Sequence, residues 1–179
     1  MQASEYQRAA RTTAIYPAAA GVYYPALGLS GELGELCNKA KKIIRGDVTF
    51  DARLEDFRKE LGDVLWYIAA TASDRGFALA DLVADAECGQ QLTGDLYSTL
   101  LDLEKSSGDL AGMADEIKTH GISVYRRQYT QSRLEQVLRG CGRLCFIFNV
   151  NMNDVCKANI QKLFYRKEAG TIKGDGDNR

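Results

Sequence analysis

Apolar residues recur every three or four positions along most of the chain, which is the spacing that gathers them on one face of an α-helix. This pattern predicts helices near residues 3–15, 28–45, 53–74, 79–91, 94–118, 131–149 and 153–168. The segments between them are rich in residues that favour turns, as in "YPAAAGVYYP" and "RGDVTFD". No stretch alternates long enough to predict a sheet, since "ISVYRRQYT" is short and basic. We therefore expect an all-α fold in the form of a helical bundle.

The size and charge of the chain narrow the classes of protein to which it can belong. With 179 residues it can bury a substantial core, and we expect residues 1–179 to form a single compact unit. Its 23 Lys and Arg against 24 Asp and Glu give a net charge of −1, which argues against stable nucleic-acid binding. No run approaches the roughly 20 apolar residues that span a membrane, and the N-terminus lacks the apolar core of a signal peptide. We expect a cytoplasmic protein without a membrane partner.

Two pairs of acidic residues stand out, because each pair is spaced to project from one face of a helix. Glu32 and Glu35 form the first pair, and Glu60 and Asp63 form the second. If the two helices pack with these faces together, four carboxylates meet, and buried anions need a counter-charge. Oxygen donors without Cys or His select Mg²⁺, with Mn²⁺ as a substitute, over Zn²⁺. The sequence therefore predicts a divalent-cation site between the two helices.

The acidic pairs also have an ordinary interpretation. An ExxE pair is usually part of a solvated charged face, and Glu35 and Lys39 are spaced as a helical i,i+4 ion pair. The second pair favours the metal site, because its helix is apolar on almost every side from Val64 onward. Glycines at every third position of the first helix leave room for a close helix or ligand, namely Gly28, Gly31 and Gly34.

Longer segments accompany these acids: "EYQRAARTTAIYP", "YPALGLSGELGELCNKAKKIIRGD", "RKELGDVLWYIAATASDRGFALADL" and "NIQKLFYRKEAGTIKGDGDNR". Together they resemble the MazG-like nucleotide pyrophosphohydrolases of the all-α NTP pyrophosphatase superfamily, which also contains the dimeric dUTPases. The family pattern of ExxE followed by ExxD is matched by the two acidic pairs. The resemblance covers roughly residues 4–86 and 153–179 and leaves the middle of the chain unexplained. It implies a bundle of the all-α NTP pyrophosphatase type.

The resemblance also implies an activity, which is hydrolysis of a nucleoside triphosphate to its monophosphate and pyrophosphate with Mg²⁺. Canonical or modified deoxynucleotides are the expected substrates. The implied metal ligands are Glu32, Glu35, Glu60 and Asp63. We take Glu35 as the residue that receives the proton of the attacking water. Since family members assemble through helix packing, we also expect a homodimer.

A second set of residues is implied to contact the phosphates. Asn159, Lys162 and Arg166 lie on one helix face and match an NxxKxxxR pattern that the family places near the triphosphate. The ordinary alternative for this face is a solvated basic helix end. Weaker candidates for the nucleotide pocket are Gln7, Lys39, Lys42 and Tyr67.

A faint internal repeat divides the chain into residues 1–92 and 93–179. "SGEL" at 30–33 resembles "SGDL" at 107–110, and "RLE" occurs at both 53–55 and 133–135. In this alignment the second half lacks the acids and the first half lacks the phosphate-binding helix. A diverged duplication would then build one composite site per chain. The alternative is one domain with a helical insertion near residues 88–140.

Two other functions stay open. Within the same superfamily, the substrate could be dUTP specifically or phosphoribosyl-ATP, because motif spacing does not identify the residues that recognise the base. From a different class, the chain could be a non-catalytic helical binding or scaffold module that retains the fold. Loss of acids in the second half favours that alternative, whereas the four intact acids in the first half argue against it.

Overall fold

The computed structural model describes residues 1–87 and 94–173, and its long elements in these ranges are all helices. They are α1 (Ala3–Thr13), α2 (Tyr24–Ile44), α3 (Phe50–Arg75), α4 (Leu79–Glu87), α5 (Leu96–His120), α6 (Val124–Ile147) and α7 (Met152–Glu168), with a 3₁₀ turn at Ala18–Ala20. Within the same ranges, no helix combines the length and apolar character needed to cross a bilayer. The expected all-α fold is confirmed.

The helices begin and end close to the predicted residues, except that α2, α3 and α6 start four, three and seven residues earlier than expected. α2 begins at Tyr24, four residues before the expected position, with Pro25 in the first turn, where its missing N–H is not needed. α6 begins at Val124 because the Ser123 side chain accepts a hydrogen bond from the Arg126 N–H and caps the helix. The expected extension of the fourth helix to residue 91 lies outside the described residues.

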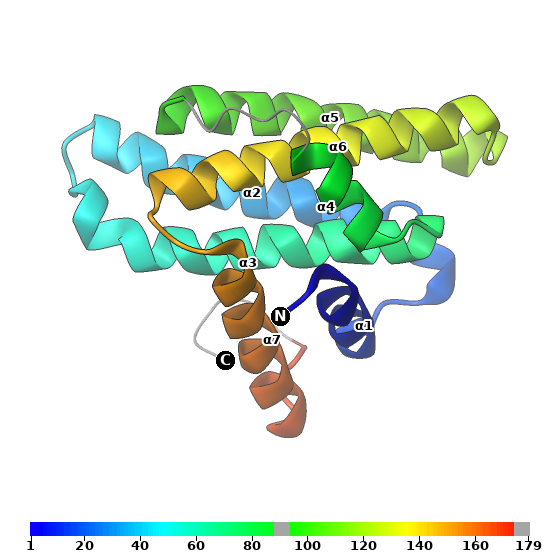
Figure 1. The fold of residues 1–179 in the computed structure, drawn as a ribbon, viewed down its shortest axis with the longest axis horizontal. Helices are drawn as coiled ribbons and strands as arrows, with labels where there is room; N and C mark the ends of the chain where they lie inside the picture. Colours follow the sequence, from blue (N-terminus) through cyan, green and yellow to red (C-terminus); the bar gives the residue numbers. More distant parts are fainter. Residues whose placement is uncertain (88–93, 174–179) are drawn as a thin grey trace.

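Four long helices, α2, α3, α5 and α6, run alongside one another and make the body of the bundle (Figure 1). α1 and α7 pack beside each other on α3, and α4 packs on α6. The core between the helices is mainly leucine and alanine with a few aromatic rings, and it includes Leu33, Phe57, Leu61, Leu134 and Phe148, all at most 1% exposed. The last helix of the chain therefore lies against the helix that carries Glu60 and Asp63.

Helices from the two proposed halves of the chain pack against one another. α7 from the second half packs on α3 from the first, while α4 from the first half packs on α6 from the second. Where α2 meets α5, the Ser30 and Ser107 hydroxyls lie 2.9 Å apart, and these are the serines of "SGEL" and "SGDL". The diverged duplication stays a prediction, and this crossed arrangement is what it expects of a composite site.

Two helix glycines allow close approaches that a side chain would block. A Cβ at Gly28 of α2 would lie 2.1 Å from the ring of Tyr67, and a Cβ at Gly62 of α3 would lie 3.0 Å from Asn159 Cβ. At Gly31 and Gly34, by contrast, a Cβ would meet no atom within 4 Å. The expected close approach therefore applies to Gly28, and the space over the other two glycines is open.

Substituting alanine at Gly28 and Gly31 should change stability in opposite directions. Alanine is favoured over glycine inside a helix by about 1 kcal/mol. Gly31→Ala should raise the free energy of unfolding by up to about that amount, because its methyl group enters open space. Gly28→Ala should lower it by about 1–3 kcal/mol, because the Tyr67 ring must shift. Urea denaturation measures both, and equal effects at the two positions would contradict the packing described here.

Candidate functional site

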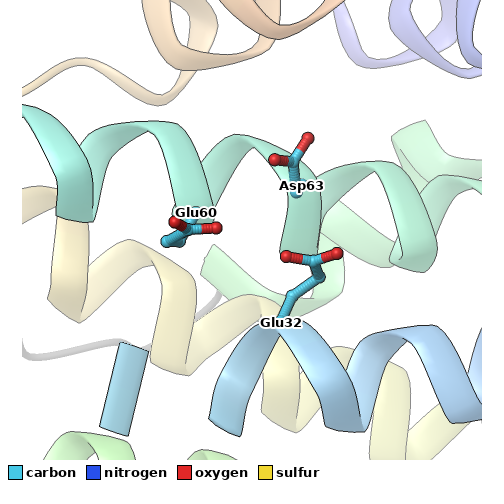
Figure 2. Close-up of side chains that lie close together, drawn as sticks. All are labelled: Glu32, Glu60 and Asp63. Carbon is cyan, nitrogen blue, oxygen red and sulfur yellow. The ribbon is translucent and has the colours of Figure 1, made fainter. Parts of the chain in front are cut away.

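Three of the four predicted acids converge between α2 and α3 (Figure 2). Glu32 reaches from α2 toward the face of α3 that carries Glu60 and Asp63. One carboxylate oxygen from each of the three lies within 4.8 Å of the others. Such a cluster of oxygen donors suits a hard divalent cation such as Mg²⁺. The i,i+3 spacing brought Glu60 and Asp63 to one helix face, and packing of α2 on α3 added Glu32.

Glu35 lies one turn further along α2 and lines the same cavity as the three clustered acids. Its side chain is 58% exposed, and its carboxylate stands 3.9 Å from the Lys39 ammonium. Glu35 is not part of the group whose ligand atoms lie within 4.8 Å of one another. Its role as a fourth metal ligand or proton acceptor stays a prediction.

Two lysines neutralise two of the clustered acids. The Lys39 ammonium lies 2.6 Å from a Glu60 oxygen, and the Lys162 ammonium lies 2.6 Å from Asp63 Oδ2. Glu60 is 3% exposed, so an unpaired charge there would be costly to desolvate. Among the described residues, no cation forms an ion pair with Glu32. The cluster thus holds one more carboxyl group than it has paired lysines.

Glu32 is the carboxyl group of the cluster that has no paired lysine. Burial raises the pKa of this carboxyl from 4.5 to about 8, and the negative charges of Asp63, Glu60 and Glu35 add to the effect. At neutral pH, without a bound cation, Glu32 therefore carries a proton. A divalent cation at the cluster would supply the missing positive charge and favour the ionised form. The residues present thus fit a hard cation both in donor type and in charge.

α7 adds the predicted polar residues to the same site. The Asn159 side-chain N–H donates to Asp63 Oδ1 at 2.8 Å, so together with Lys162 it occupies both oxygens of that carboxylate. Arg166, one turn further along α7, is 5% exposed and lines the same cavity as the acids. The three residues of the NxxKxxxR pattern are therefore brought to the acidic cluster and do not form a solvated helix end.

The cavity over the acids has a volume of about 160 Å³. At roughly 30 Å³ per water in the liquid, this volume corresponds to about five waters, which is enough space for a small hydrated ion. One wall is aromatic, from Tyr24, Trp66 and Tyr67. Tyr67 was predicted at this site. Trp66 is buried and also lines the cavity. Tyr24 precedes the predicted start of the second helix, and the sequence analysis did not identify it.

Two weaker candidates lie away from the acids. The Gln7 amide donates to the Phe77 carbonyl at 2.8 Å and accepts from the Leu79 N–H at 2.9 Å. Both groups of this side chain thus join α1 to the turn between α3 and α4, outside the cavity. Lys42 is exposed in the last turn of α2 and does not line the cavity either. Of the two predicted lysines of α2, the structure therefore brings Lys39 to the acids and leaves Lys42 away from them.

Comparison with known proteins gives a partial relative. No protein-family model matches the chain, and no solved structure matches it significantly. The chain is 46% identical over 82 residues to the "Gene 37 protein" of Mycobacterium phage L5, across 41% of this chain and 71% of that protein. The chain belongs to the family of this phage protein. The name Gene 37 protein states no activity, so the function has to be argued from the site.

In this member of the Gene 37 family, the proton on Glu32 should make folding stability depend on pH. Between pH 4.5 and about 8 the folded state keeps the proton that the unfolded state releases, so the stabilising contribution falls as pH rises. Glu32→Gln removes this loss and should be the more stable protein above pH 8, by about 1–2 kcal/mol after allowance for solvent screening.

Urea unfolding in the presence of a chelator, from pH 4 to pH 9, measures this difference. The two proteins should have similar stability near pH 4, where Glu32 is protonated in both states, and diverge as pH rises. Parallel curves for the two proteins over the whole range would show that Glu32 titrates normally.

Proposed function

We propose that this protein is a Mg²⁺-dependent nucleoside triphosphate pyrophosphohydrolase of the MazG-like type. The observation that carries the proposal is the contact of α7 with the acidic cluster, where Asn159 and Lys162 bond to Asp63. The chain thus places a cation-binding group beside residues that suit phosphates. Because α7 belongs to the same chain as the acids, the site is composite within one subunit, and the expected homodimer is a separate prediction.

The proposed reaction assigns different roles to residues at and beside the acidic cluster. The triphosphate lies over Lys162 and Arg166, whose positive charges offset those of the phosphate oxygens. A bound Mg²⁺ would neutralise charge that builds on the phosphate oxygens. A water adds to the α-phosphorus, the bond from that phosphorus to the bridging oxygen of the β-phosphate breaks, and pyrophosphate leaves with this oxygen. The proton of the water passes to Glu35, which lines the cavity but stands outside the close cluster.

Pyrophosphate release from a panel of canonical and modified ribo- and deoxynucleoside triphosphates with Mg²⁺ tests the proposal. Glu35→Gln and Asp63→Asn should each lower kcat/KM by about 100-fold or more, since one removes the proton acceptor and the other a ligand. Asp102→Asn is the matched control, because Asp102 forms an ion pair with Arg143 away from the cavity and should leave activity unchanged.

Absence of release from every nucleotide, by folded protein that binds Mg²⁺, would contradict the proposal. Phosphoribosyl-ATP would then be the next substrate to assay. Failure there as well would favour a non-catalytic helical module. Release that survives both substitutions would instead show that another site, or a contaminant, performs the reaction.

Removing the Lys162 ammonium should affect cation and nucleotide binding in opposite directions. The ammonium competes with a cation for Asp63, so Lys162→Met should tighten Mg²⁺ binding about 3- to 10-fold when no nucleotide is present. The same variant should weaken binding of a non-hydrolysable triphosphate analogue, because a phosphate contact is lost. Isothermal titration calorimetry measures both affinities.

Lys105→Met is the control for this measurement, because Lys105 is exposed on α5 and does not line the cavity. It should leave both affinities unchanged. If Lys162→Met weakened Mg²⁺ binding, the lysine would be supporting the cation site and not competing for it.

A further inference from the structure

One buried hydroxyl group connects the N-terminal helix to the acidic cluster. Tyr6 of α1 is 1% exposed, and its oxygen lies 3.0 Å from Asn159 Oδ1 and 3.3 Å from the carbonyl oxygen of Gly62. Tyr6 is not among the residues that line the cavity over the acids. It can therefore act on the site only through the groups that it touches, which are Asn159 and the backbone of α3 at Gly62.

The direction of the hydrogen bonds along this path is fixed by chemistry. The Asp63 carboxylate, paired with Lys162, can only accept, so the NH₂ group of Asn159 must face it. The amide oxygen of Asn159 then faces Tyr6, and an amide oxygen can only accept. Tyr6 must therefore donate. With this donor in place, the Asn159 amide has one favoured orientation, and it is the one that directs N–H to Asp63.

We infer that Tyr6 is a positioning residue for the cation site. Through its hydrogen bond to Asn159, Tyr6 holds the Asp63 carboxylate in the orientation that ligates a cation. The inference rests on the metal site of the proposed function. Gly62 contributes to the same arrangement, since a Cβ at this position would lie 3.0 Å from Asn159 Cβ and would crowd that side chain. Removing a group that hydrogen-bonds to a metal ligand and orients it commonly lowers metal affinity 10- to 100-fold.

The experiment is a double-mutant cycle on Mg²⁺ affinity, measured by isothermal titration calorimetry without nucleotide. Tyr6→Phe keeps the ring and removes the hydroxyl, while Asn159→Leu keeps the shape of the side chain and removes its polar atoms. Each should weaken Mg²⁺ binding about tenfold. Because both substitutions break the same chain of hydrogen bonds from Tyr6 to Asp63, the double variant should bind Mg²⁺ about as weakly as Asn159→Leu alone. Thermal unfolding checks that each variant is folded.

Thr130→Val is the matched control. Thr130 is a buried residue whose hydroxyl donates to the Arg126 carbonyl within its own helix, away from the acids. Its loss should lower the unfolding temperature, as Tyr6→Phe should also do, but it should leave Mg²⁺ affinity unchanged. A purely structural role for Tyr6 would give the same result as this control.

Three outcomes would overturn the inference, and they are distinguishable. Unchanged affinity in Tyr6→Phe, or in Asn159→Leu if the tyrosine variant does not fold, would reject the positioning role and leave the metal site intact. Additive losses in the double variant would show that Tyr6 acts by another route. No Mg²⁺ binding by the unaltered protein would reject the metal site itself, and the positioning role with it.

Discussion

The structure depends on how the Asp63 carboxylate is held between two helices. Asp63 lies on α3, in a helix whose following residues are almost all buried, and both of its oxygens are bonded by side chains of α7. A carboxylate in such a place is costly unless donors and a positive charge surround it. Asn159 supplies the neutral donor and Lys162 the charge. The packing of α7 on α3 therefore has an electrostatic reason as well as a hydrophobic one.

The same requirement explains why the charges of the three clustered acids are neutralised in different ways. Glu60 has Lys39 and Asp63 has Lys162, while Glu32 meets its desolvation by keeping a proton. The site is thereby close to electrical balance without any bound ion. The paired cations are both lysines, whose flexible side chains can change partners at little conformational cost. Such a site is stable when empty and still able to exchange its partners.

The sequence predicted the parts of this site that depend on local spacing. The acids at i,i+3 and the polar face of α7 follow from helix periodicity, which holds wherever the helix packs. The helix starts at Tyr24 and Val124 were less predictable, because a proline or a single serine cap set them. Gln7 lies outside the cavity, because its amide bonds to Phe77 and Leu79, and local spacing does not predict those partners. Tyr6 was missed because it is one of 9 tyrosines and nothing next to it in the chain marks its hydrogen bond to Asn159.

The crossing of α7 onto α3 also has a consequence for the order in which the molecule folds. Asp63 and Lys162 are separated by 99 positions, and Tyr6 and Asn159 by 153. Contacts between residues so far apart close large loops and tend to form late, after the local helix pairs α2–α3 and α5–α6. Until then the acids face water, where their charges are tolerated. Burial of Asp63 should therefore coincide with the arrival of Lys162 from α7, so that this carboxylate is not buried without a partner.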